Sequence, residues 1–254
     1  MDNNVNKFTG KAKIYNKYRS SYPVQCIDDI IASNPSNKNM IIADIGAGTG
    51  KLTELFLKRG IKVIAVEPNH DMINIAKENL REYGNLIKFN EESAENTKIE
   101  NNSIYVITVA QAFHWFDKEL FKNECKRILK ENGTIAIMWN FLDYKKELEG
   151  KIIDIQKKYT KLTFNASEEK QRDEDIIQFF GENKYKLKIY ENNYLQNYEK
   201  FIGNQLSMSY SLKESDEKYN EYVSEFKKLF EEFSEDNMVT IHNNTYCYFG
   251  SVNM

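Results

Sequence analysis

DIGAGTGKLT (residues 44–53) is the stretch on which the fold prediction depends, and three kinds of strand-to-helix loop resemble it. A phosphate-binding P-loop needs G-x-x-x-x-G-K-[ST], but Ile45 stands in place of its first glycine and Leu52 in place of its metal-binding hydroxyl. A dinucleotide fingerprint needs G-x-G-x-x-G, and Lys51 occupies the position of its third glycine. Both of these interpretations are therefore disfavoured.

The third pattern, D-x-G-x-G-x-G, is matched in full by Asp44, Gly46, Gly48 and Gly50. Glycines at these positions permit a tight turn and let the backbone approach a ligand closely. Asp44 ends a strand where ligands of open α/β sheets bind, so it can face a cationic amino acid group directly or through water. Glu67 ends the next strand, where a carboxylate can accept both hydroxyls of a ribose. These residues favour S-adenosylmethionine (SAM), which joins an amino acid to a nucleoside.

Residues 40–140 alternate between short apolar runs and apolar residues at helical spacing. The apolar runs predict five strands, at 40–46, 61–67, 86–90, 103–111 and 134–140. Helices are expected between them; Asp117 suits the N-cap of one, and Asn132-Gly133 predicts a turn into the fifth strand. Continuous apolar strands that alternate with amphipathic helices indicate a parallel sheet covered on both faces.

The chain after residue 140 has a different pattern, with more helix than strand. The elements predicted there are a helical stripe from Leu148 to Leu162, a helix near 173–180, a strand at 184–192, helices near 195–204 and 214–233, and an extended segment at 238–252. No internal repeat or flexible linker separates the two halves. We therefore expect one α/β domain with inserted helices.

The composition limits the classes of partner. The 254 residues are 41% hydrophobic and 29% charged, with a formal net charge of −3 and no basic block, which argues against nucleic-acid binding. No apolar run approaches the roughly 18 residues of a membrane span, and the first residues lack the apolar core of a signal peptide. The three cysteines are far apart and form no C-x-x-C, so neither a metal site nor a disulfide framework is expected. We expect a cytoplasmic protein with no membrane partner.

Over about residues 8–140 the chain resembles the class I SAM-dependent methyltransferases, in particular the methyltransferase type 11-like proteins. The resemblance implies SAM as the cofactor. It also implies a doubly wound, seven-stranded Rossmann-like sheet whose last strand is antiparallel. Residues 1–36 are then an N-terminal segment that covers the cofactor. Residues 37–254 are the methyltransferase domain, with a helical cap from about 141–170 and 193–235.

Two further segments are similar to the trans-aconitate-type methyltransferases, a small-molecule subgroup that acts on carboxyl groups. AQAFHWFD (110–117) resembles the H-W-F-D block after the fourth strand of that subgroup, and GKAKIYNKYRSSYP (10–23) resembles its N-terminal Y…YRPSYP segment. The chain departs from the pattern where Ser20 replaces a proline, Tyr105 replaces an acid, and residues 131–133 replace a Pro-Gly-Gly turn. None of these departures touches the glycine loop.

The resemblance supplies the remaining candidate ligands of SAM. Ser93, Ala94 and Glu95 follow the third strand, where the family holds the adenine, although Glu95 also suits a solvated acidic surface. Arg19 could bind the SAM carboxylate through its guanidinium fork, or form an ordinary surface ion pair. The full set of expected cofactor-binding residues is Tyr15, Arg19, Asp44, Gly46, Ala47, Gly48, Gly50, Glu67, Pro68, Met72, Ser93, Ala94, Glu95 and Gln111.

His114 is the candidate catalytic residue, because it follows the fourth strand near the expected position of the methyl group. It could act as a general base, orient a carboxylate substrate, or fix the loop through backbone hydrogen bonds. A carboxylate nucleophile needs no base, and methyl transfer depends mostly on alignment. The predicted function is transfer of a methyl group from SAM to a small molecule, with a carboxylic acid as one candidate, by a monomer or homodimer. The alternatives are methylation of RNA or protein, and SAM binding without catalysis.

Overall fold

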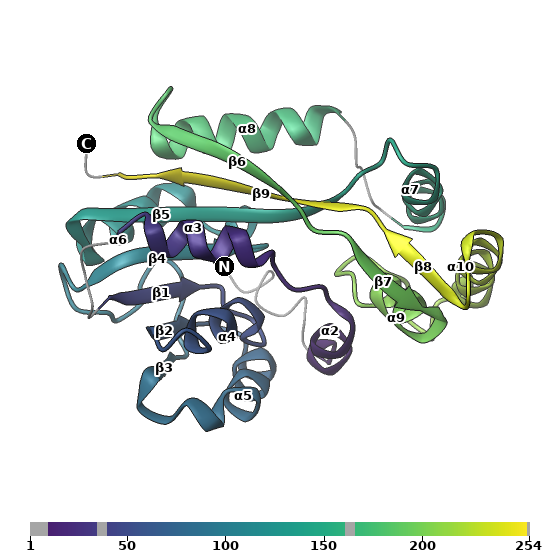
Figure 1. Ribbon diagram of the computed structural model, residues 1–254, viewed down its shortest axis with the longest axis horizontal. Helices are drawn as coiled ribbons and strands as arrows, with labels where there is room; N and C mark the ends of the chain where they lie inside the picture. The colour runs from purple at the N-terminus through teal and green to yellow at the C-terminus, as the bar shows by residue number, and fades with distance from the viewer. Residues whose placement is uncertain (1–9, 35–39, 161–165, 253–254) are drawn as a thin grey trace.

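The computed structural model describes residues 10–34, 40–160 and 166–252, and its centre is a seven-stranded sheet (Figure 1). Residues 1–9 and 35–36 of the predicted N-terminal segment, and Leu162 of the predicted helical stripe, lie outside this part of the chain. The strands are β1 (Ile41–Ile45), β2 (Lys62–Val66), β3 (Ile87–Asn90), β4 (Ile104–Ala110), β5 (Leu129–Leu142), β6 (Tyr185–Glu191) and β9 (Asn243–Gly250).

The order of the strands is β3-β2-β1-β4-β5-β9-β6. The first five strands pair in parallel, whereas β9 is antiparallel to both of its neighbours, β5 and β6. The predicted doubly wound sheet with its antiparallel last strand is therefore confirmed. All the parallel strands present their carboxyl ends to one edge of the sheet, so the loops that follow β1, β2, β3 and β4 lie near one another.

Helices cover both faces of the sheet because the strands are apolar on both faces. Ile42 and Val106 pack on one side with α3 (Val24–Ala32) and α4 (Lys51–Leu57). Ala43 and Ile107 pack on the other side with α6 (Lys118–Ile128) and α8 (Ala166–Phe180). The remaining helices of this half are α2 (Ala12–Tyr18), α5 (His70–Asn79) and the 3-10 helices η2 (Arg81–Leu86) and η3 (Phe113–Trp115).

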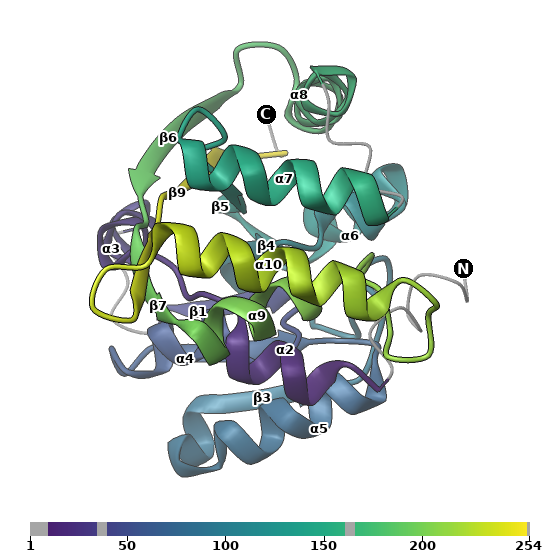
Figure 2. The same ribbon diagram turned by 90° about the vertical axis from the view of Figure 1, so that its right-hand side faces the viewer.

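A third hydrophobic core lies beyond the carboxyl end of β5 and includes Phe201, Tyr222 and Phe226. We call the elements that form it the cap: α7 (Glu147–Tyr159), β7 (Tyr194–Asn197), α9 (Tyr198–Leu206), α10 (Tyr219–Phe233) and β8 (Met238–Ile241). Figure 2 shows α7, α10, α9 and α2 lying across this side of the molecule. Helix α2 packs so closely on α9 that a Cβ added at Gly203 would lie 2.5 Å from the ring of Tyr18.

Three boundaries in the second half differ from the sequence prediction. Residues 195–197 belong to strand β7 rather than to a helix, because they pair with β8 and because Asn197 caps α9 by accepting a hydrogen bond from Lys200 N–H. Helix α10 begins at Tyr219 rather than near 214. The extended segment 238–252 is divided at His242, whose N–H donates to the buried carboxylate of Glu149 instead of to a strand.

The predicted turn at Asn132-Gly133 is also wrong. Strand β5 begins at Leu129, directly after α6, and these residues lie within it. Ile104 is paired with Leu129 but Val106 with Thr134, so the register shifts between the two pairs. The extra residues of β5 are accommodated by this irregularity and not by a turn before the strand.

In the part of the chain that the structure describes, no helix combines the length and the apolar character that crossing a bilayer would need.

Substitution of Phe121 should test the core between the sheet and α6. The Phe121 side chain is fully buried and its ring stacks on that of Phe179 at 5.6 Å between centroids. We expect Phe121→Ala to lower the free energy of unfolding by about 3–5 kcal/mol in urea titrations. The neighbouring Leu120 is 44% exposed, so Leu120→Ala is the matched control and should cost less than about 1 kcal/mol. Equal losses would contradict this packing.

Candidate active site

Two connected hollows lie where the carboxyl ends of β1, β2, β3 and β4 meet. The larger, which we call the main cavity, has a volume of about 280 Å³. It is lined by Tyr15, Gly46, Gly48, Glu67, Pro68, Asn69, Met72, Ser93, Ala94, Glu95, Ala110, Gln111, Ala112, Trp115, Phe116 and Asp117. The smaller, which we call the side chamber, has a volume of about 30 Å³ and shares Tyr15, Gly46, Gly48 and Ala110 with the main cavity.

The glycine loop turns tightly between β1 and α4. Gly46 has a φ of 71°, and a Cβ added there would lie 2.5 Å from the Cβ of Ala112. The N–H groups of Gly46 and Ala47 both donate to the carbonyl of Val66, at 2.8 and 3.0 Å, which ties the loop to β2. Gly48 has a φ of 58° and no atom within 4 Å of an added Cβ, so it borders open space in the main cavity. The loop therefore forms a cradle that a side chain at position 48 would fill.

Glu67 joins this loop to the end of β2. Its Oε2 accepts from Gly48 N–H and its Oε1 from Asn69 N–H, both at 2.9 Å. Burial raises the pKa of the Glu67 carboxyl to about 7, against the opposing effect of these two hydrogen bonds. Each carboxylate oxygen can accept a further hydrogen bond, and Glu67 lines the main cavity. It can therefore receive two hydroxyl donors from a ligand.

Asp44 lies deeper, at the wall of the side chamber. Its Oδ2 accepts from the Thr53 hydroxyl at 2.6 Å and its Oδ1 from the Thr108 hydroxyl at 2.9 Å. Burial raises the pKa of the Asp44 carboxyl to about 6. The two threonines were not identified from the sequence. Thr108 is brought to Asp44 by the register between β1 and β4, a long-range pairing that no local pattern signals.

The far wall of the main cavity combines apolar and polar groups. Met72, Ser93, Ala94 and Glu95 all line it, and the carboxylate of Glu95 accepts a hydrogen bond from Asp117 N–H at 3.0 Å. Glu95 is thus held at the cavity rather than extended into solvent. This wall offers an apolar surface and a fixed carboxylate to a flat heterocycle.

The predicted candidates Pro68, Tyr15 and Gln111 also line the main cavity. Asn69 and Ala110 do so as well, although the sequence did not single them out. Asn69 could have been found from its place as the N-cap of α5, where its side chain accepts from Met72 N–H. Trp115, Phe116, Ala112 and Asp117 complete the wall.

Three predicted residues do not line the main cavity or the side chamber. The guanidinium of Arg19 reaches the carbonyl of Ser207 at 3.4 Å and lies over the ring of Tyr15. Gly50 caps α4 with a φ of 82° and faces Leu80. His114 is exposed on η3, with its Nδ1 3.4 Å from Nε1 of Trp139. Of the predicted cofactor-binding residues, Asp44 and Ala47 line the side chamber but not the main cavity.

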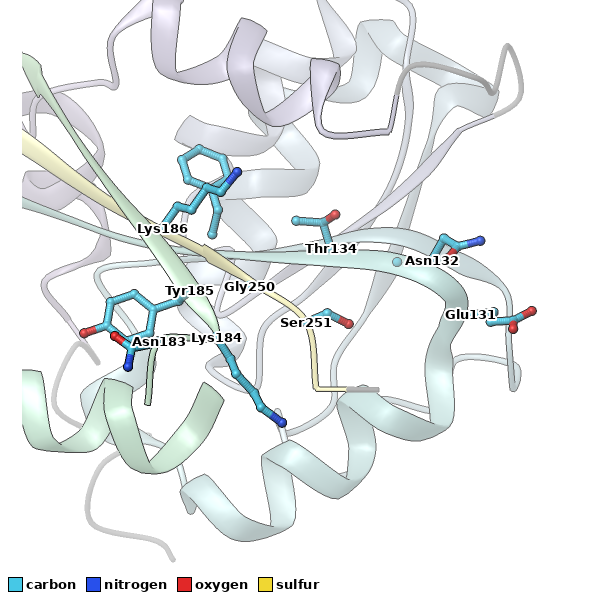
Figure 3. A pocket seen from close by; sticks show the side chains of 11 residues that line it. Glu131, Asn132, Thr134, Asn183, Lys184, Tyr185, Lys186, Gly250 and Ser251 are labelled. Carbon is cyan, nitrogen blue, oxygen red and sulfur yellow. The ribbon is translucent and has the colours of Figure 1, made fainter. Parts of the chain in front are cut away.

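A larger hollow of about 510 Å³ lies at the opposite edge of the sheet, beside the start of β5, the start of β6 and the end of β9 (Figure 3). It is bordered by Glu131, Thr134, Lys184 and Ser251, among others. Open α/β sheets bind their ligands at the carboxyl ends of the parallel strands, and this hollow is at the amino end. The main cavity is therefore the candidate active site.

Residues 43–137 match the family model for a methyltransferase domain. Over 141 residues the chain is 29% identical to a relative from Saccharomyces cerevisiae named a probable S-adenosylmethionine-dependent methyltransferase, covering 53% of this chain and 48% of that protein. Residues 43–137 are therefore similar to a methyltransferase domain.

A relative from Mycobacterium tuberculosis named an uncharacterized methyltransferase is 34% identical over 129 residues, covering 51% of this chain and 50% of that protein. The chain thus spans about half the length of the curated relatives it matches. A solved structure described as a candidate type II methyltransferase from Anaeromyxobacter dehalogenans shares the fold, with a TM-score of 0.63 and 17% identity over 92% of this chain and 98% of that one.

The residues of the site fit SAM in chemistry. Glu67 has the acceptor capacity for two ribose hydroxyls, and the cradle at Gly48 leaves room for close approach to the backbone. The side chamber places the Asp44 carboxylate where a cationic amino group is expected. Met72 and Ala94 line the main cavity with apolar atoms, on which an adenine would pack.

The two glycines of the loop should respond differently to substitution. In Gly48→Ala the new methyl group would enter the main cavity, so we expect at least a tenfold loss of affinity for S-adenosylhomocysteine (SAH). The positive φ should cost about 1 kcal/mol of stability. In Gly46→Ala the methyl group would collide with Ala112, so the loss of stability should be the larger one. Calorimetric titration and thermal unfolding of both variants would measure this, and equal effects on stability would contradict the geometry.

The raised pKa of Glu67 predicts a pH-dependent affinity. Ribose hydroxyls donate to the ionised carboxylate, so SAH should bind about tenfold more tightly at pH 8 than at pH 6, as the carboxyl loses its proton near pH 7. Glu67→Gln should remove most of this dependence and weaken binding at pH 8 by at least about 1.5 kcal/mol. Titration calorimetry at the two pH values checks both statements.

The stability of the protein without ligand should change with pH in the opposite direction to the affinity. The folded protein holds the Glu67 proton up to about pH 7, whereas the unfolded chain loses it near pH 4.3, so the free energy of unfolding should fall as pH rises between these values. Asp44 acts in the same direction up to about pH 6. Glu67→Gln should flatten the part of the curve above pH 6. If Glu67→Gln left the pH dependence of the free energy of unfolding unchanged, Glu67 would be ionised across this pH range and the prediction would be wrong.

Proposed function

We propose that this protein transfers a methyl group from SAM to a small-molecule acceptor. The observation that carries the proposal is the Glu67 carboxylate, fixed by two backbone N–H groups beside the open cradle at Gly48. The net charge of −3 also favours this class over RNA.

The N-terminal segment has the contacts of a cover. Tyr15 lines both hollows, and Asn140 at the end of β5 donates to the carbonyl of Ser21 at 3.2 Å. Asn204 of α9 donates to the carbonyl of Tyr18 at 3.0 Å. These contacts tie the segment to both the sheet and the cap. We propose that residues 1–36 cover the cofactor and that the regions 141–170 and 193–235 bound the acceptor.

When bound, SAM supplies a methyl group on a sulfonium. A nucleophile attacks the methyl carbon in line with the carbon–sulfur bond, and the thioether leaves. The protein contributes position: Glu67 orients the ribose, and the wall around Glu95 orients the adenine. Gln111 lies at the end of β4 with its Nε2 held by the carbonyl of Asn140 at 3.2 Å, so it can orient an acceptor beside the cavity. Proton removal by His114 would be needed only for an acceptor less nucleophilic than a carboxylate, and it would need His114 to move toward the cavity.

A carboxylic acid is our proposed acceptor, and the trans-aconitate-type subgroup our proposed assignment. Both rest on the similarity of residues 10–23 and 110–117 to that subgroup. We also propose that the protein is located in the cytoplasm and is a monomer or a homodimer. The cytoplasmic location is supported by the three cysteines, since all are free and buried.

Incubation of the purified protein with methyl-labelled SAM and a cell extract should place the label in the small-molecule fraction. The Gly48→Ala variant, which fills the cradle, is the control and should transfer at least tenfold less label. Label in RNA or in protein would overturn the acceptor class. Tight SAH binding with no labelled product from the whole extract would instead identify a non-catalytic SAM-binding protein.

A further inference from the structure

Strand β6 ends the seven-stranded sheet, and β9 is its one neighbour among the strands that the structure describes (Figure 1). It pairs with β9 from Tyr185 to Glu191 without a shift of register, and it contains no proline. A regular edge strand is open to pairing with another strand unless the protein protects it. The edge of β6 that faces away from β9 is therefore a candidate interaction surface.

The hydrogen bonds to β9 determine which residues of β6 face this free edge. The N–H of Asn192 donates to the carbonyl of Asn243 at 2.7 Å, directly after the last pair of the ladder, Glu191 with Asn244. Opposite residues of an antiparallel pair are hydrogen-bonded alternately, so the even-numbered residues of β6 bond to β9 as Asn192 does. The odd-numbered residues direct their N–H and C=O groups to the free edge. These residues are Tyr185, Leu187, Ile189 and Glu191.

Two of these outward residues carry exposed apolar side chains. Leu187 is 43% exposed and Ile189 is 54% exposed. Residues two apart in a strand lie on the same face of the sheet, so the two side chains are neighbours. The free edge thus combines unpaired backbone groups with adjacent apolar side chains. These are the features by which a strand adds to another sheet.

A second copy of β6 complements this edge when the two strands run antiparallel with Lys188 on the twofold axis. Leu187 of one copy then lies opposite Ile189 of the other, on both sides of the axis. Tyr185 lies opposite Glu191 in the same way. All of these residues face the free edge, so each pair can exchange its backbone hydrogen bonds. One register therefore matches both the backbone groups and the apolar side chains.

The charges at the axis are compatible with this register. It brings the two copies of Lys188 together, but the Lys188 ammonium is paired with the Asp29 carboxylate of α3 at 2.8 Å. Two carboxylates therefore balance two ammonium groups at the axis. Lysines often protect an edge strand from pairing, and this ion pair weakens that protection.

The neighbouring registers are less favourable. A register centred on Leu187 would set Lys188 against Lys186 of the other copy on both sides of the axis. This adds two lysines to the same pair of carboxylates, and like charges directly opposite each other are destabilising. A register centred on Ile189 would place Leu187 opposite Glu191, so an apolar side chain would face a carboxylate. The register centred on Lys188 avoids both contacts.

We propose that the protein forms a symmetric homodimer in which β6 of one copy pairs antiparallel with β6 of a second copy. The two seven-stranded sheets then form one continuous sheet across the twofold axis. This selects the homodimer from the two states proposed above and depends on no feature of the cofactor site. No residue of β6 lines the main cavity or the side chamber, so each copy keeps its own candidate active site.

Sedimentation equilibrium of the whole chain tests the dimer. The wild-type protein should sediment as a dimer that dissociates on dilution. Ile189→Lys should weaken self-association at least about tenfold, because both apolar pairs of the interface are lost. Leu195→Lys is the matched control, since Leu195 is 60% exposed on β7, and it should leave self-association unchanged. A wild-type monomer at the highest soluble concentration, or an equally stable dimer of Ile189→Lys, would overturn the proposal.

A paired substitution tests the register. Leu187→Lys and Ile189→Glu should each weaken the dimer when introduced alone. In a chain that carries both, each new ammonium lies opposite a new carboxylate of the other copy, so about tenfold of the affinity should return. In a register centred on either residue, like charges would stay opposite each other and nothing would be regained. A double variant no tighter than the single ones would therefore overturn the proposed pairing.

Titration of each variant with SAH separates this proposal from the proposed function. All the variants should bind SAH as the wild-type protein does, because the substituted residues lie outside the candidate site. Unchanged SAH affinity in Ile189→Lys together with loss of the dimer supports the proposal and excludes unfolding as the cause. Failure of the wild-type protein to bind SAH would overturn the proposed function, whereas sedimentation alone decides the dimer.

Discussion

The hydrogen bonds between the Glu67 carboxylate and the backbone N–H groups of Gly48 and Asn69 are the interaction on which the site depends. They fix the glycine loop after β1 against the start of α5, two segments that are far apart in the sequence. The carboxylate is buried where it makes these bonds. Burial disfavours the ionised form and raises the pKa of the carboxyl. The folded protein therefore holds a buried acid whose ionised form can accept further hydrogen bonds. In the proposed function, the side chain that fixes the loop would also bind the ribose.

The fold of the first half was predictable from the sequence because its determinants are local. Apolar runs placed the five parallel strands, and the N-cap role of Asp117 is confirmed by its hydrogen bond from Leu120 N–H. The glycine loop and Glu67 were predictable for the same reason, since each acts at the end of its own strand. Thr108 was not predictable as a partner of Asp44, because the register of two strands brings them together. Strand β7 was missed because only its pairing with β8 makes it a strand.

The N-terminal segment connects the cofactor site with the cap. On one side Tyr15 lines both hollows, and on the other Tyr18 packs against Gly203 of α9. Lys11 extends the same contact, since its Nζ donates to the carbonyl of Met208 at 3.0 Å. A displacement of α2 would therefore open the cavity and loosen the cap together. Arg19 takes part in this connection, since its guanidinium donates to the carbonyl of Ser207 at 3.4 Å.

Asp44 and Lys51 face the same chamber and yet do not neutralise each other. Burial raises the pKa of Asp44, and only the hydroxyls of Thr53 and Thr108 and the backbone N–H of Thr53 act against it. Burial lowers the pKa of Lys51, and only Glu54 acts against it. Each charge is thus left partly uncompensated by the protein. A zwitterion between them would compensate both at once, whereas a simple anion or cation would compensate one and leave the other buried.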